Sequence, residues 1–200
     1  SDEELTERQA NGKGLTRPEL SVLVAYGKMV LKEWFNVEEV TEDPYLNQTL
    51  ITSFPLLLQQ RYVNEMHQHP LKQEIVATRL ANKVVDDVGF NFVTRLVEET
   101  GATPAEICNC YVTACEVFGV WDLFDKIEGL DNQISAQLQL KMMDDLRRII
   151  RRATRRFLTL RDRSLGIAQQ IERYQPSYLQ LQQHLMDVLA AEEVKLVNEE

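Results

Sequence analysis

Apolar residues recur every three or four positions along most of this chain, which is the spacing that one face of an α-helix needs. The pattern is clearest over residues 17–35, 70–88 and 135–161, where we predict the longest helices. No segment alternates between apolar and polar residues for long, so we expect no sheet. The pattern therefore predicts an all-α fold, an irregular bundle of about eight to ten helices.

The helix predicted at 135–161 is the longest, and we expect it to form the spine of the bundle. Its apolar residues share one face when the helix turns once in about 3.6 residues. This predicted buried face consists of Leu138, Met142, Leu146, Ile149, Ala153, Phe157 and Leu160.

Capping residues and glycines mark the expected helix ends. Thr16 and Glu19 have the spacing of a capping box, in which the threonine hydroxyl and the glutamate carboxylate each accept from the other residue's backbone N–H. Thr103 and Glu106 repeat this spacing. Gly89 is placed to end the 70–88 helix in the left-handed conformation.

A chain of 200 residues is long enough for one domain with its own core. We expect a polar, flexible leader at 1–14, a helical bundle at 15–163, and terminal helices of the same domain at 164–200. Within the last segment, Pro176 predicts the start of a new helix, because proline lacks the N–H that a helix interior needs. The tail beyond residue 190 is acidic.

Charge and cysteine content narrow the class of protein. The net charge of −9 argues against a nucleic-acid-binding domain, which needs a basic surface. The apolar runs are far shorter than the roughly 20 residues of a membrane span, so we expect no membrane partner. Cys108, Cys110 and Cys115 are an odd set within one helix and predict buried thiols in a reducing cytoplasm.

Candidate catalytic chemistry is sparse. The close glycine pair, Gly12 and Gly14, follows no predicted strand and lacks the third glycine of a dinucleotide fingerprint. His67 and His69 lack the further ligands that a metal needs. We therefore predict no catalytic residue, no cofactor-binding residue and no metal ligand in this chain.

One feature is stronger than these, a run of arginines at 147–163 that contains no lysine and lies mostly on the 135–161 helix. Two neighbouring stripes form a candidate docking face: Arg147, Arg151 and Arg155, and beside them Arg148, Arg152 and Arg156. Arg161 and Arg163 are expected to extend it. Guanidinium groups this close repel one another and call for anionic partners. Three kinds of partner are possible. The first is acidic side chains of the same domain, which would form salt bridges with the arginines. The second is another domain or subunit on which the face docks, and the third is an anionic ligand or nucleic acid.

Several short runs, in this order and spacing, resemble the C-terminal region of the large bacterial NAD-specific glutamate dehydrogenases over about residues 14 to 180. They include Gly-Leu-Thr-Arg-Pro-Glu-Leu at 14–20, Asp-Pro-Tyr-Leu at 43–46, His-Pro-Leu at 69–71, Leu-Ala-Asn at 80–82, Glu-Glu-Thr-Gly-Ala at 98–102, Leu-Asp-Asn at 130–132 and the arginine block at 147–156.

The resemblance implies a parent enzyme that oxidatively deaminates L-glutamate to 2-oxoglutarate and ammonia with NAD as cofactor. The dehydrogenase core would lie upstream of this region, so the chain is expected to be an inactive, structural or regulatory helical domain of a cytoplasmic, oligomeric enzyme. Its implied partners are the upstream catalytic domain and neighbouring subunits. Covering the active site, joining subunits and sensing an effector all stay open as its role. The alternative is a free-standing helical module whose arginine face binds an acidic protein or nucleic acid.

Overall fold

The computed structural model describes residues 2–37 and 40–198, and every regular element in these ranges is helical, which confirms the all-α prediction. Within these ranges, side chains are described up to Leu185, except for Asp2 and Leu5, and also for Asp187. The elements are α1 (Asp2–Ala10), α2 (Arg17–Val37), η1 (Val40–Glu42), η2 (Pro44–Leu46), α3 (Asn47–Ile51), α4 (Leu56–Gln59), α5 (Val63–His67), α6 (Lys72–Val88), α7 (Phe92–Thr100), α8 (Pro104–Val117), α9 (Val120–Glu128), α10 (Ala136–Leu160) and α11 (Ile167–Asn198).

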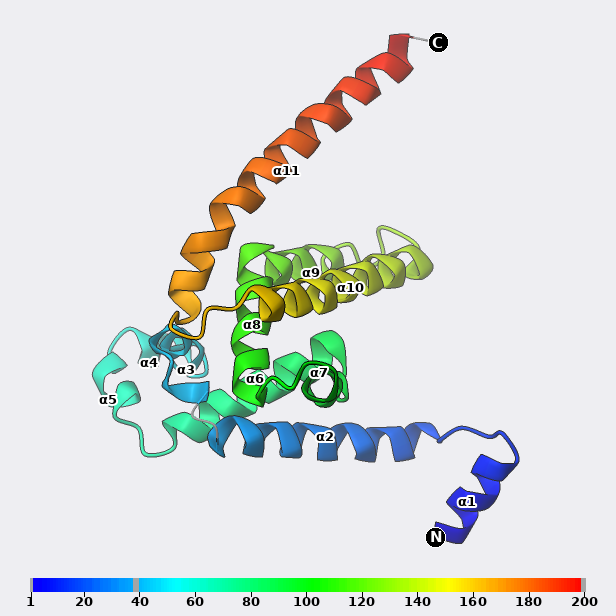
Figure 1. Ribbon diagram of the computed structural model, residues 1–200, viewed down its shortest axis with the longest axis vertical. Coiled ribbons are helices and arrows are strands. Elements are labelled where there is room, and N and C mark those ends of the chain that lie inside the picture. Colours follow the sequence, from blue (N-terminus) through cyan, green and yellow to red (C-terminus); the bar gives the residue numbers. More distant parts are fainter. Residues whose placement is uncertain (1, 38–39, 199–200) are drawn as a thin grey trace.

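The helix at the centre of the bundle is α8, not the longer α10 that the sequence pattern favoured as the spine. Helices α2, α7, α9, α10 and α11 all contact α8 (Figure 1). Its side chains are apolar or small on nearly every side, so the helix can be enclosed, whereas α10 carries arginines that keep one side in solvent. The buried positions of α8 are Ile107, Cys108, Cys110, Tyr111, Val112, Thr113, Ala114, Cys115 and Val117.

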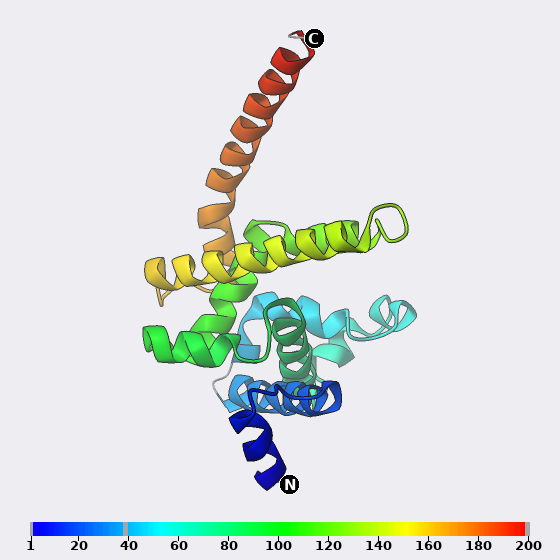
Figure 2. The same cartoon turned by 90° about the vertical axis from the view of Figure 1, so that its right-hand side faces the viewer.

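The outer helices leave this body in opposite directions. Figure 2 shows α11 projecting away from the bundle toward the C-terminus, while α1 and α2 lie at the other end. The segment predicted as a flexible leader contains α1. Arg8 of α1 donates to both carboxylate oxygens of Glu19, at 2.7 and 2.9 Å, and thereby ties α1 to the start of α2.

Both predicted capping boxes lie at helix starts, but at α2 the Thr16 hydroxyl donates to the Glu19 carboxylate instead of accepting from the Glu19 N–H as predicted. At α8 the box is complete, with Glu106 N–H bonded to the Thr103 hydroxyl and Thr103 N–H bonded to the Glu106 carboxylate. At α2 the Thr16 N–H donates to Glu19 at 2.6 Å, and the Thr16 hydroxyl donates to the same carboxylate oxygen. The bonds from Thr16 and Arg8 lower the pKa of Glu19 to about 2.

A buried carboxylate joins α8 to two neighbouring helices, α6 and α9. Asp87 of α6 accepts from the Tyr111 hydroxyl at 2.5 Å and from the Trp121 indole N–H at 3.3 Å. Lys83 lies 3.1 Å from its other oxygen and balances its charge. A buried charge is tolerated only when it is paired and hydrogen-bonded, so this cluster fixes how α6, α8 and α9 meet.

Three local predictions need correction. Pro176 lies inside α11 instead of starting a new helix, because its exposed position lets water satisfy the carbonyl that its missing N–H leaves free. As a result α11, with 32 residues, and not α10, with 25, is the longest helix that the structure describes. Gly89 does follow α6 with a positive φ of 95°, but its ψ of 154° is extended instead of left-handed helical, a conformation open to glycine.

The buried face of α10 is rotated from the predicted one. Ile150 is fully buried at 0% exposure, whereas Ile149 is 41% exposed. Leu138 and Leu160 are also exposed, and Leu158 is buried in place of Leu160. Because apolar residues lie next to each other in this helix, two different faces fit the helical period equally well. Packing against α8 selects the face that leaves the arginines outside.

This rotation predicts a sharp contrast between two neighbouring isoleucines. Ile150→Ala should lower the free energy of unfolding by about 2–5 kcal/mol, because it opens a cavity in the core. Ile149→Ala should lower it by about 1 kcal/mol or less. Urea unfolding of both variants measures the difference, and equal losses would contradict the observed face.

Candidate functional site

The six predicted docking arginines occupy one broad side of α10, and two of them are paired within the helix itself. Arg147 lies 2.9 Å from the carboxylate of Asp144, and Arg148 lies 3.1 Å from Asp145. Both pairs span three residues, a spacing that brings side chains together on a helix surface. Such exposed pairs contribute little stability, about 0–1 kcal/mol.

Two further arginines reach other elements. Arg151 donates to the backbone carbonyl of Val88, the last residue of α6, at 2.9 Å. Arg155 is paired with Glu99 of α7, which Arg95 also approaches at 3.7 Å. These contacts hold α10 against the ends of α6 and α7.

The last two arginines are exposed, and neither Arg152 nor Arg156 has a bonding partner among the described residues. The predicted face is therefore divided. Arg147 and Arg148 pair within α10, Arg151 and Arg155 bond to other helices, and Arg152 and Arg156 are open. A role in docking for this face stays a prediction.

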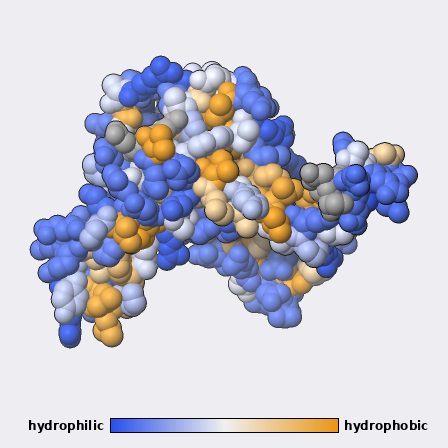
Figure 3. Space-filling view, turned by 90° about the horizontal axis from the view of Figure 1, so that it is seen from below, coloured by the Kyte–Doolittle hydropathy of each residue, from blue (hydrophilic) through white to orange (hydrophobic). Residues whose placement is uncertain are grey.

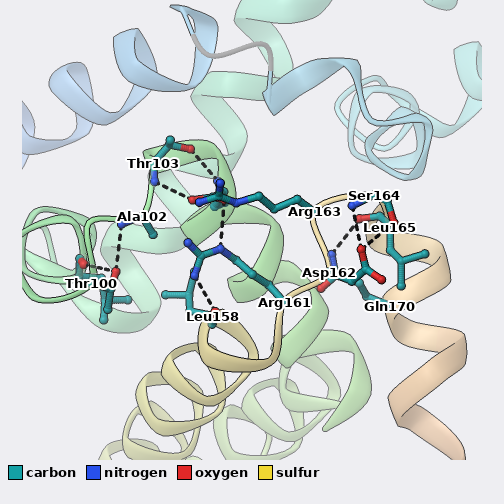
Figure 4. A network of polar contacts seen from close by, with 12 residues as sticks. Thr100, Ala102, Thr103, Leu158, Arg161, Asp162, Arg163, Ser164, Leu165 and Gln170 are labelled. Carbon is teal, nitrogen blue, oxygen red and sulfur yellow. Dashed lines mark hydrogen bonds and ion pairs between the residues drawn. The ribbon is translucent and has the colours of Figure 1, made fainter.

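Arg161 and Arg163 do not extend the face as expected. Helix α10 ends at Leu160, and both arginines turn toward Glu106 at the start of α8 (Figure 4). The Nε atoms of Arg161 and Arg163 lie 3.0 and 2.6 Å from the same Glu106 oxygen. Arg161 also donates to the carbonyl of Leu158, which closes the end of α10.

The electrostatics of Glu106 follow from these bonds. Burial opposes its ionisation, but the Thr103 N–H and the guanidinium groups of Arg161 and Arg163 together outweigh burial and lower the pKa of Glu106. One carboxylate thus joins the start of α8, the end of α10 and the segment that leads to α11. The sequence predicts the capping box, but it does not predict that Arg161 and Arg163, more than 50 residues away, pair with the same glutamate.

The cysteines and His69, the remaining candidate residues, take part in the packing and hydrogen bonding of the fold. Cys108, Cys110 and Cys115 are free and buried, as predicted, and burial raises the pKa of each thiol, to about 12 at Cys110. His69 accepts the N–H of Leu71 through Nδ1, at 3.1 Å. Within the described residues, no group of three histidine, cysteine or acidic side chains is close enough to hold a metal ion.

A dinucleotide site and a membrane span place their own demands on a fold. The described residues contain no strand, and therefore no strand–turn–helix unit of the kind that holds a dinucleotide in a Rossmann fold. No single helix of the described chain is long and apolar enough to cross a membrane, although α8 and α9, bent by 63° at their junction, satisfy the length and composition together. Helix α8 lies largely within the protein core, whereas α9 buries only Val120, Phe124 and Ile127 and leaves most of its other residues exposed.

Fold and site define an all-α domain with a divided arginine face. A family model described as the C-terminal part of glutamate dehydrogenase matches residues 12–200. The chain is 44% identical over 193 residues to the NAD-specific glutamate dehydrogenase of Halomonas elongata, which covers 96% of the chain and 12% of that relative. The enzyme of Pseudomonas aeruginosa is 43% identical over 94% of the chain and 12% of its own length. That of Mycobacterium tuberculosis is 34% identical over 87% of the chain and 11% of its own length.

The chain belongs to the family of glutamate dehydrogenase C-terminal domains, as its resemblance predicted. It spans 11–12% of the length of these relatives, so it corresponds to their C-terminal part.

The Glu106 cluster predicts a specific pH dependence. A carboxylate whose pKa is lowered by folding adds stability above its unfolded pKa of about 4.3, and loses it as the pH falls through the folded value. Glu106→Gln should therefore lower the free energy of unfolding by about 1–3 kcal/mol at pH 7. The gap between wild type and variant should shrink toward pH 3.

Urea unfolding at both pH values measures this gap. Glu98→Gln is the control, because Glu98 is an exposed carboxylate on α7. An unchanged gap at the two pH values would mean that the ionised form of Glu106 does not stabilise the junction.

Proposed function

We propose that this chain is a non-catalytic structural domain that packs against the preceding part of an NAD-dependent glutamate dehydrogenase. The parent reaction is the oxidative deamination of L-glutamate to 2-oxoglutarate and ammonia, with NAD as the hydride acceptor. The catalytic residues and the NAD site belong, in this proposal, to the preceding part. The proposal rests on family membership and on a surface of α2 that the domain leaves uncovered.

The exposed apolar arc of α2 is the observation that carries the proposal. Only Leu31 and Phe35 of this helix are buried. Apolar residues also cover its outer side, although the outer side of a surface helix ordinarily carries polar residues. We define the α2 arc as Val22, Leu23, Tyr26, Met29, Val30 and Val37, whose exposures range from 41% to 71%. The space-filling view from below shows apolar side chains gathered across this side of the molecule (Figure 3).

A continuous exposed apolar surface indicates a protein partner. The preceding part of the polypeptide is the nearest candidate, since the relatives continue far beyond the length of this chain. The open arginines Arg152 and Arg156 offer a second, polar contact for the same partner or for a neighbouring subunit. A free-standing module that binds nucleic acid is less well supported, because the net charge of −9 opposes it.

The proposed setting is the cytoplasm, within an oligomeric enzyme. Three buried free thiols are compatible with a reducing compartment. An apolar arc that is covered in the assembled enzyme also accounts for a surface that would otherwise promote aggregation.

The first expected outcome concerns activity. The 200-residue chain, mixed with L-glutamate and NAD, should give no NADH absorbance above a blank without protein. A longer polypeptide that includes the preceding part should give it under the same conditions. Glutamate-dependent NADH formation by the chain alone would contradict a non-catalytic role.

The second expected outcome concerns the role of the α2 arc in binding the preceding part. Charged substitution at its centre, Tyr26→Asp with Met29→Glu, should leave the chain folded by circular dichroism, because both side chains are exposed. It should abolish co-purification of the chain with the separately expressed preceding part. Leu140→Glu, at an apolar position of α10 that is 61% exposed, is the matched control and should retain the complex. Equal behaviour of the two variants would reject the arc as the contact.

A further inference from the structure

A cavity of about 440 Å³ opens between α7 and α10, at the end of α6. Four of the six arginines of the predicted face line one wall, and α7 supplies most of the other. The lining residues are Val88, Asn91, Phe92, Arg95, Leu96, Glu99, Arg148, Arg151, Arg152 and Arg155. The two arginines at the edges of the face, Arg147 and Arg156, lie outside the lining.

The charge of this lining is strongly unbalanced. It contains five arginines and one glutamate, an excess of four positive charges in a chain whose net charge is −9. Guanidinium groups held around one small space repel one another unless an anion lies among them. Glu99 pairs with Arg95 and Arg155, and Asp145, outside the lining, pairs with Arg148, so Arg151 and Arg152 have no carboxylate partner among the described residues.

The guanidinium groups keep hydrogen-bonding capacity for a ligand. Each has five N–H donors, and the bonds described above use only part of them. Arg151 donates to Val88, and Arg155 shares Glu99 with Arg95. Arg152 has no partner among the described residues, so its whole fork is free to bind an oxyanion.

The floor of the cavity is apolar. Val88, Phe92 and Leu96 line it and are themselves buried, with exposures of 1%, 6% and 3%. Its volume falls in the range of about 300–1,000 Å³ that is usual for small-molecule sites. The lining therefore combines a hydrocarbon surface with a rim of oxyanion donors.

We propose that this cavity binds a small organic anion with at least two negative charges, carried by carboxylate or phosphate groups on a compact skeleton. The anion is held by Arg152 and Arg148 from α10 and by Arg95 from α7, with its apolar part over Phe92. A bound anion would bridge α7 and α10. The proposal does not depend on the parent reaction, because the site lies wholly within this chain.

Binding is tested by calorimetric titration of the 200-residue chain with succinate and with pyrophosphate, at constant ionic strength. At least one should bind at one site per chain with a Kd below about 1 mM, and acetate should bind at least about tenfold more weakly. Preference for succinate or for pyrophosphate identifies carboxylate or phosphate as the better group. Lack of saturable binding by both would overturn the proposal.

Single substitutions distinguish a specific binding site from a general attraction of anions to a basic helix. Arg152→Gln and Arg95→Gln should each weaken binding by about tenfold or more, the effect of losing a charge-assisted hydrogen bond. Arg156→Gln is the matched control on the same helix and should stay within about twofold, since Arg156 lies outside the lining. Equal weakening by Arg152→Gln and Arg156→Gln would overturn the proposed site.

The same site predicts a thermal shift. An anion that binds only the folded chain should raise the Tm by roughly 5 °C at about 100 times its Kd. The rise should be lost in Arg152→Gln and kept in Arg156→Gln. A rise of the same size in both variants would also overturn the proposal.

Discussion

The enclosure of α8 is the constraint on which the rest of this fold depends. A helix that is surrounded by other helices must be apolar on nearly every side, and its few polar groups must find partners within the protein. Tyr111 meets this demand through Asp87, and Glu106 meets it through Arg161 and Arg163. These two polar contacts determine which ends of α6, α9 and α10 come to lie beside α8.

The distribution of charge follows from the same arrangement. With one side of α10 packed on α8, its arginines are directed toward solvent and toward α7. Glu99 neutralises only part of that charge, since two arginines approach the same carboxylate. The remaining positive charge is concentrated at a cavity instead of being spread over the surface, in a domain that is acidic overall.

Local features of the fold could be predicted from the sequence, because they depend on residues close together in the chain. The capping box of Thr103 and Glu106 and the extent of α10 are examples. Contacts over long sequence separations could not be predicted, and the pairing of Glu106 with Arg161 is one of them. The choice between Ile149 and Ile150 as the buried residue could not be predicted either. Both fit the helical period, and only packing against α8 determines which of them is buried. The pattern likewise indicates that α2 is apolar, but not that most of its apolar surface is left uncovered.

We propose above all that the preceding part of the enzyme covers the α2 arc. Hydroxyl-radical footprinting, read by mass spectrometry, tests it directly at Tyr26 and Met29, which are 61% and 63% exposed in this chain. Both should be labelled strongly in the 200-residue chain and at least about fivefold less in the full-length enzyme, because packing excludes the radical with water. Equal labelling of these two residues in both proteins would contradict the account.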